Sequence, residues 1–180
     1  GGGGLGLGGA HAKVATQHDG ADIGVTAEVE TMIGRVLKRF GGIDILVNNA
    51  VTRHYAPVEA FPVDKWDRAL AVNLSSCFHT IRLALPAMKA KNWGRIINIA
   101  SVHGLVASAN KSAYVAAKHG VVGLTKVIAL ETAETPVTCN AICPGWVLTP
   151  LVDQQIRARA KAEGKSYEAA KLELVGEKHP

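Results

Sequence analysis

Hydrophobic positions along the chain follow two spacings, one typical of helices and the other of buried strands. Between Val29 and Phe40, apolar residues recur every three or four positions, which predicts an amphipathic helix that ends at Gly41. The apolar run "IDILVNNA" at 43–50 is short and almost continuous, like strands that are buried on both faces of a parallel sheet. This region therefore predicts a helix followed directly by a strand.

The same alternation continues to residue 145. Residues 64–91 have the spacing of a second helical stretch, which Pro86 should bend or break. A strand-like run at 94–101 comes next, then a long helical stretch at 112–133 and a third strand-like run at 137–145. Strands and helices that alternate without a dividing linker predict one α/β domain with a parallel sheet.

The two ends of the chain depart from this pattern. The first ten residues, "GGGGLGLGGA", contain the glycine spacing of a phosphate-binding loop through Gly2, Gly6 and Gly8. Such a loop needs a strand before it and a helix after it, and the sequence up to Asp22 has no room for them. Two interpretations stay open, a remnant of that loop or an unrelated low-complexity run. Residues 151–180 are polar with helical spacing, which predicts a surface helical pair or a mobile lid.

Composition narrows the function classes. The chain has 180 residues, of which 48% are hydrophobic and 19% charged, so it should form a globular core. The net charge of +5 comes from dispersed basic residues, and only 5% of residues are aromatic, so nucleic acid is not an expected partner. Three cysteines, Cys77, Cys139 and Cys143, lack zinc spacing; we expect them to be reduced, with no metal site.

Neither a membrane segment nor a secretion signal is evident in the sequence. We expect no apolar run long enough to cross a bilayer, and the N-terminus lacks the charged and apolar regions of a signal peptide. The resulting expectation is a cytoplasmic protein that does not contact membranes.

Candidate chemistry lies where the predicted strands end. Ligands bind at the carboxyl ends of the strands in a parallel sheet, and polar or glycine-containing segments follow the three strands at 48–51, 101–104 and 144–149. Ser101 closes the second strand, and the next helix begins with Tyr114 and Lys118, four residues apart and so on one helical face. A lysine cation beside a phenol stabilises the phenolate, which makes a general base. The plainer alternative is that Tyr114 packs in the core and Lys118 reaches solvent.

Asn73 lies within the second helical stretch, where asparagine is a mediocre helix former. Its amide either bonds to the nearby backbone or holds a water molecule in line with Lys118.

These features together resemble a known family. "NNA" after a strand, Asn73, Ser101, the Y-x-x-x-K pair and "PGWVLT" occur in the order and spacing of short-chain dehydrogenases/reductases, from about Asp19 to the C-terminus. The resemblance implies a Rossmann-like doubly wound parallel sheet and an NAD or NADP cofactor. It implies that Tyr114 is the general acid/base, that Lys118 supports it and holds ribose hydroxyls, that Ser101 bonds the substrate oxygen, and that Asn73 anchors a water.

The resemblance also implies a set of cofactor contacts around the strand ends. They are Asp22, Ile23, Asn48, Ala50, Tyr114, Lys118, Pro144, Gly145, Val147 and Thr149. The family pattern has one βαβ unit between the glycine-rich loop and "GAD", which this sequence lacks. The family pattern also has a further helix and strand after "EKHP". We therefore expect residues 1–180 to form a single partial domain, incomplete at both ends. The family also implies a homo-oligomer, a tetramer in its full-length members.

Three longer stretches resemble the family members that interconvert D-3-hydroxybutyrate and acetoacetate with NAD: "WGRIINIASVHGLV", "AYVAAKHGVVGLTKV" and "VTCNAICPGWVLTPLV". The substrate would be a small carboxylate. The residues that would bind it are Arg53, His103, Lys111, Trp146 and Gln155.

Two residues depart from that pattern. Arg53 stands where glutamine is usual, and Val51 replaces the glycine after "NNA". Arg53 either holds a carboxylate more strongly, crowds the pocket or faces solvent. Two alternatives remain for the whole chain: an NADP-linked acetoacetyl or 3-oxoacyl thioester reductase of the same family, and a non-catalytic remnant.

Overall fold

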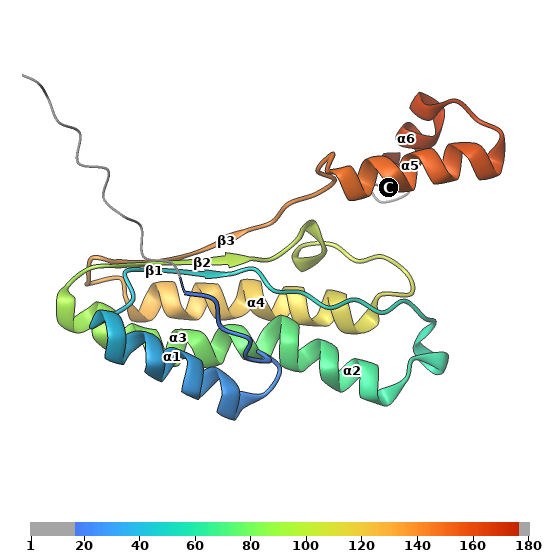
Figure 1. Ribbon diagram of the computed structural model, residues 1–180. Helices are drawn as coiled ribbons and strands as arrows, with labels where there is room; N and C mark the ends of the chain where they lie inside the picture. Colours follow the sequence, from blue (N-terminus) through green and yellow to red (C-terminus); the bar gives the residue numbers. More distant parts are fainter. Residues whose placement is uncertain (1–16, 177–180) are drawn as a thin grey trace, which may run out of the picture.

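The computed structural model describes residues 17–176, so the predicted glycine loop lies outside the described residues. The chain alternates helices with three strands, as the sequence predicts (Figure 1). The elements are α1 (Thr26–Phe40), β1 (Ile45–Asn48), the 3-10 helix η1 (Val58–Ala60), α2 (Val63–Leu70), the π-helical turn η2 (Ala71–Ser75), α3 (Ser76–Lys91), β2 (Gly94–Ile99), the 3-10 helix η3 (Val102–Gly104), α4 (Ser112–Glu131), β3 (Val137–Ile142), α5 (Pro150–Glu163) and α6 (Tyr167–Gly176).

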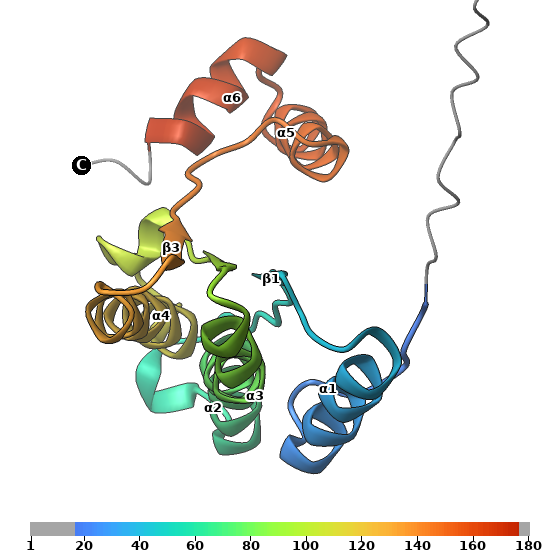
Figure 2. The same cartoon turned by 90° about the vertical axis from the view of Figure 1, so that its left-hand side faces the viewer.

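The three strands form a parallel sheet in the order β1-β2-β3. Helices α3 and α4 cover one face of it, and α1 packs beside α3 (Figures 1 and 2). In register, Leu46 lies opposite Ile96, which lies opposite Cys139. These side chains point to the helix-covered face and pack with Ile81 and Met88 in the main hydrophobic cluster. The core is therefore a single layer between the sheet and its helices.

The opposite face of the sheet is open within residues 17–176. Ile45, Val47 and Ile142 are 57%, 52% and 50% exposed, and no described element packs on them (Figure 2). The expectation of strands buried on both faces is therefore wrong for the described part of the chain, where only alternate residues are buried.

A chain of polar side chains crosses the buried face of the sheet. The Asn48 amide donates to Asn98 Oδ1 at 2.8 Å, and the Asn98 amide donates to Thr125 Oγ1 at 2.9 Å. Thr80 Oγ1 donates to Asn48 Oδ1 at 2.8 Å. The chain links α3 to α4 through two strands, and Asn98 is fully buried. Because each amide has partners, the polar groups are accommodated in an otherwise apolar layer.

The helix boundaries confirm one prediction and correct another. Helix α1 ends at Gly41, whose positive φ of 77° suits glycine and whose N–H bonds Leu37 O at 2.9 Å. Helix α3, however, runs unbroken through Pro86, so the predicted break there is wrong. The irregular turn instead lies at η2, between α2 and α3.

Helix α4 is long and apolar enough to cross a membrane by length and composition alone, which corrects the expectation that no segment reaches that limit. In the structure it packs on β3 and η3 and carries the buried polar residues Lys118 and Thr125. Core helices commonly pass the same test, so α4 is weak support for a membrane segment.

Helices α5 and α6 pack on each other and extend away from the sheet on the segment after β3 (Figures 1 and 2). Asp153 joins them, since it accepts hydrogen bonds from Tyr167 Oη at 2.7 Å and from Arg157 Nε at 2.6 Å. Residues 150–176 are thus the helical pair that the sequence predicts; a lid role stays a prediction.

Candidate active site

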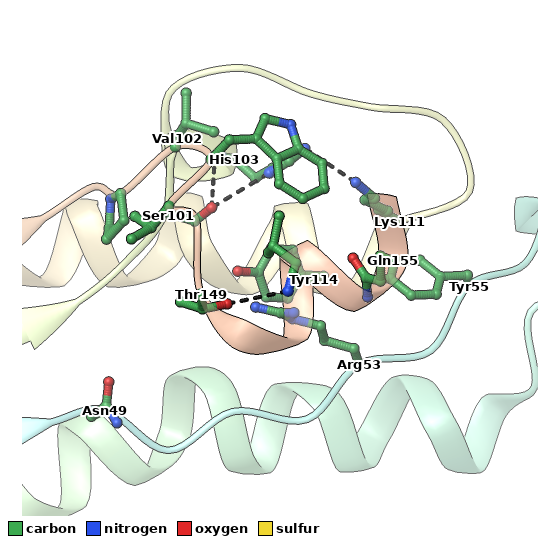
Figure 3. Close-up of a pocket in the computed structure, with 15 residues that line it drawn as sticks. Asn49, Arg53, Tyr55, Ser101, Val102, His103, Lys111, Tyr114, Thr149 and Gln155 are labelled. Carbon is green, nitrogen blue, oxygen red and sulfur yellow. Dashed lines mark hydrogen bonds between the residues drawn. The ribbon is translucent and has the colours of Figure 1, made fainter. Parts of the chain in front are cut away.

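A cleft of about 510 Å³ lies at the carboxyl ends of the strands, with α5 forming its outer wall (Figure 3). Its lining comes from the segments after all three strands and from the start of α4. The residues are Asn49, Arg53, Tyr55, Ser101, Val102, His103, Lys111, Tyr114, Pro144, Gly145, Trp146, Val147, Thr149, Val152 and Gln155. The parallel sheet thus brings the three segments that follow the strands, at 48–51, 101–104 and 144–149, to one cleft, as the sequence predicts.

Tyr114 and Lys118 lie on the face of α4 that meets the sheet. Tyr114 is 8% and Lys118 only 3% exposed, so Lys118 does not reach solvent. The ammonium lies 5.8 Å from the Tyr114 ring centroid and donates to Ile99 O at 2.6 Å. Burial lowers the pKa of Lys118, because it disfavours the charged form. The burial of Lys118 excludes the alternative of a surface lysine, and a buried cation beside a phenol that lines a cleft is an arrangement found more often at functional sites.

Ser101 begins the turn that leads from β2 into η3. Its hydroxyl accepts the backbone N–H of His103 at 3.1 Å, which fixes the side chain at the strand end. The His103 ring packs edge-on to Tyr114 with centroids 5.9 Å apart. In Figure 3 the Tyr114 hydroxyl points into the space beneath Ser101. The cleft therefore places a hydroxyl and a phenol where one substrate oxygen could meet both.

The approach of η3 to α4 depends on a glycine. A side-chain carbon at Gly104 would lie 2.8 Å from the Lys118 carbonyl oxygen, a distance that real Cβ atoms do not show. The close contact holds the segment with Ser101 and His103 against the turn that carries Tyr114 and Lys118.

Asn73 is fully buried in η2, and both ends of its amide bind one backbone unit. Its Oδ1 accepts from Thr52 N at 2.8 Å, and its Nδ2 donates to Thr52 O at 2.9 Å. The side chain therefore anchors the segment after β1. The amide binds backbone, but not the nearby backbone that the sequence suggested, since Thr52 is 21 residues away. The water-holding role stays a prediction.

All five predicted substrate-binding residues line the cleft. The Arg53 guanidinium carbon lies 5.5 Å from the Tyr114 ring centroid. The Lys111 ammonium lies 3.4 Å from His103 Nε2 and 5.7 Å from the Tyr55 ring centroid. Gln155 reaches the cleft from α5, and Trp146 from the segment after β3.

Comparisons with known proteins show the family of this chain. The family profile described as short chain dehydrogenase matches residues 7–160. The D-beta-hydroxybutyrate dehydrogenase of Cupriavidus necator is 64% identical over 163 residues, 91% of this chain and 63% of that protein. The protein of the same name from Rhizobium meliloti is 59% identical over 158 residues, 88% of this chain and 61% of that protein.

The chain belongs to the short-chain dehydrogenase family.

Solved structures show the same fold. Actinorhodin polyketide ketoreductase with NADPH aligns with a TM-score of 0.72 and 36% identity, over 83% of this chain and 58% of that one. NAD⁺-bound xylitol dehydrogenase aligns with a TM-score of 0.70 and 33% identity, over 78% of this chain and 55% of that one. The Rossmann-like fold class is thereby confirmed. The chain spans less than two thirds of the length of each of these relatives.

The nicotinamide cofactor of the short-chain dehydrogenases fits the described half of the site. Pro144, Gly145, Val147 and Thr149 line the cleft beside Tyr114, as predicted. Together with the buried Lys118 ammonium, they offer backbone groups and a cation for a nicotinamide ribose. The glycines that would bind the diphosphate lie outside the described residues.

Other predicted cofactor residues lie elsewhere. Asn48 turns into the core, as described above, and it is Asn49 that lines the cleft. Asp22 and Ile23 precede α1, outside the cleft lining; the hydrogen bond from Arg68, at 2.8 Å, lowers the pKa of Asp22. Ala50 is exposed and absent from the lining.

Sequence reasoning missed some of the lining. Asn49 and Val102 fall inside the strand-end segments that the pattern highlights, so position alone could have found them. Tyr55 and Val152 lie outside those strand-end segments, Tyr55 in the loop between β1 and η1 and Val152 in α5. Their place in the cleft depends on how that loop and that helix fold back, which the sequence pattern does not show. Val51, which stands where the family has glycine, is 45% exposed and does not line the cleft.

Proposed function

We propose that this chain carries the catalytic part of an NAD-dependent dehydrogenase that interconverts D-3-hydroxybutyrate and acetoacetate. The observation that carries the proposal is Tyr114, which lines the cleft together with Ser101 and has the buried Lys118 ammonium 5.8 Å from its ring centroid. The names of the two relatives above support the substrate. Lys111, His103 and Gln155 support a carboxylate ligand, because together they offer a cation and two polar groups.

Each residue has a role that follows from its place. Ser101 donates a hydrogen bond to the substrate oxygen. The phenolate oxygen of Tyr114 takes the proton from the substrate hydroxyl. The Lys118 ammonium stabilises the phenolate. When cofactor is bound, the same ammonium would donate hydrogen bonds to the ribose hydroxyls. The nicotinamide, when bound, supplies the acceptor for the hydride. Lys111 fixes the carboxylate, so that the carbinol carbon is oriented beneath Ser101.

The first test is Tyr114→Phe. Removing the phenol oxygen removes the proton acceptor, so the rate of D-3-hydroxybutyrate oxidation should fall by at least about 100-fold, as expected for general base catalysis. NADH absorbance measures the rate. Tyr167→Phe is the matched control, since it removes the same atom from α6 outside the cleft, and it should keep activity. Turnover by Tyr114→Phe near that of the control would refute the proposed base.

The second test separates cofactor and substrate. Rates with NAD and NADP, each with D-3-hydroxybutyrate and with its coenzyme A thioester, should be highest for NAD with the free acid. A preference for NADP and thioester would instead favour a thioester reductase, which the similarity to a ketoreductase structure with NADPH also suggests. A titration with NADH tests the remaining alternative, because saturable micromolar binding would count against a non-catalytic remnant.

We also propose that the protein acts in the cytoplasm as a homo-oligomer, a tetramer by the family pattern. Three free cysteines, two of them buried, support a reducing compartment. Cell fractionation and analytical ultracentrifugation test the two statements separately.

A further inference from the structure

The cleft carries more positive charge than one carboxylate requires. Arg53 and Lys111 both line it, and none of its fifteen lining residues is Asp or Glu. Within residues 17–176 neither side chain forms an ion pair; their described partners are aromatic rings and His103. Arg53 is exposed and Lys111 half-buried, so water solvates both side chains when the cleft holds no ligand. A ligand that displaces this water would leave the two cations uncompensated unless it supplies matching negative charge.

Arg53 lies close to Tyr114, although its side chain is exposed. Its guanidinium carbon is 5.5 Å from the Tyr114 ring centroid, and its positive charge contributes to the lowered pKa of Lys118, after burial. Figure 3 shows Arg53 and Lys111 entering from different segments, with Arg53 beside Tyr114. The two cations can therefore bind separate anionic groups of one small molecule.

The backbone on either side of Arg53 is fixed. The Asn73 amide binds both backbone groups of Thr52, and Ala56 N donates to Asn110 O at 3.1 Å. The second bond joins the Arg53 segment to the residue before Lys111. Asn110 adopts a left-handed φ of 63°, which turns the chain into α4. Both cations thus stand on anchored backbone, which reduces the entropy lost when a ligand binds.

We propose that the cleft accepts a 3-hydroxy acid with two carboxylates, one held by Lys111 and the other by Arg53. The proposal rests on the proposed function, since the reaction is the same. The carbinol carbon gives a hydride to the bound nicotinamide, its hydroxyl proton goes to Tyr114, and a 3-oxo dicarboxylate forms. Arginine suits the second carboxylate because its planar group donates two parallel hydrogen bonds.

Binding is tested without turnover. Glutarate and butyrate differ in the second carboxylate, and neither has a hydroxyl group to oxidise. Calorimetric titration of the purified chain should show glutarate binding about tenfold tighter, the order expected for a hydrogen bond to a charged group. Arg53→Gln should remove most of that preference. Arg39→Gln, an exposed arginine of α1 whose described partners are Gln17 and Phe40, lowers the net charge equally and should keep it.

Turnover gives a second readout. The ratio of kcat/KM for 3-hydroxyglutarate to that for D-3-hydroxybutyrate should fall about tenfold in Arg53→Gln and stay constant in Arg39→Gln. Equal binding of glutarate and butyrate, or a preference that both variants lose alike, would overturn the dicarboxylate proposal while leaving hydroxybutyrate oxidation intact. Glutarate selectivity without oxidation of either hydroxy acid would support Arg53 as the anion site and count against the proposed function.

Discussion

At the residue scale, Lys118 shows how function and stability oppose each other. Its ammonium is buried, and its one described hydrogen bond goes to the Ile99 carbonyl. Burial lowers its pKa, which means that the folded state binds the proton less well than the unfolded chain. The charged lysine therefore destabilises the fold that positions it beside Tyr114.

Replacing Lys118 with methionine should separate the two effects. Turnover should fall at least about 100-fold, because the phenolate loses its cation, while the free energy of unfolding at pH 7 should rise. The charged lysine destabilises the fold fully below its folded pKa, and this effect is lost as pH rises from that value towards 10.5. The advantage of methionine should thus be smaller at pH 10 than at pH 7. Urea unfolding at both values measures it, and a variant less stable than the parent at pH 7 would contradict the account.

Residue spacing predicted the core of the site and missed its edges. Tyr114, Lys118 and Ser101 could be brought together from sequence, because helix periodicity and parallel-sheet topology fix their direction. Asn48 and Asn49 could not be told apart, since alternate strand residues face opposite sides and the register decides which enters the cleft. Arg53 had three open interpretations, and the structure places it in the cleft.

At the element scale, the contact between η3 and α4 decides the shape of the cleft. It is close because Gly104 has no side chain, and the nearest atom to a Cβ there is backbone, which cannot move aside easily.

Alanine at Gly104 should therefore destabilise the fold by about 1–3 kcal/mol, the usual cost of overpacking, and should lower turnover by shifting Ser101. Alanine at Gly34 is the matched control. That glycine is exposed within α1 with nothing within 4 Å of a Cβ, so the change should stabilise by about 0.5–1 kcal/mol. Urea unfolding of both variants checks the opposite signs; equal effects would remove the steric explanation.

The ends of helices could be predicted from sequence where a capping residue marks them, but not where tertiary contacts determine whether the helix continues. Gly41 ends α1 as the sequence indicates. Pro86 does not end α3, because both Pro86 and Arg82, whose carbonyl loses its partner, lie on the exposed side, where water can replace the missing bond. The π-helical turn around Asn73 was not predicted, and the contact that its side chain makes is with Thr52, 21 residues away, which local sequence does not indicate.

At the scale of the whole molecule, the open sheet face groups exposed apolar side chains on neighbouring strands. In α/β proteins a parallel sheet is covered on both faces. Within residues 17–176 the helices that pack on the strands, α3 and α4, cover one face only, and α5 and α6 extend away from the sheet (Figures 1 and 2). Ile45, Val47 and Ile142 present their side chains on the other side. Such a contiguous apolar face favours association.

The purified chain should accordingly self-associate with rising concentration, and Val47→Lys should reduce the mean scattering mass by about half or more, because a charge on this face resists burial. Val58→Lys serves as control, since Val58 is 75% exposed in η1, away from the sheet. Light scattering compares the two variants. Equal behaviour of both lysine variants would exclude the sheet face as the contact.

The amide pair of Asn48 and Asn98 restricts how the strands can align. Sliding β1 along β2 by two residues would keep every side chain on its own face of the sheet, because the alternation has that period, but it would move Leu46 from Ile96 to Asn98 or Gly94. The slide would also break the hydrogen bond between the two amides and leave Asn98 Oδ1 without its described donor in a buried layer, a penalty of about 1–3 kcal/mol. The pair thus favours the observed register of β1 and β2. A mutation that replaced only one asparagine would weaken this preference and, with it, the positions of the residues that follow the two strands.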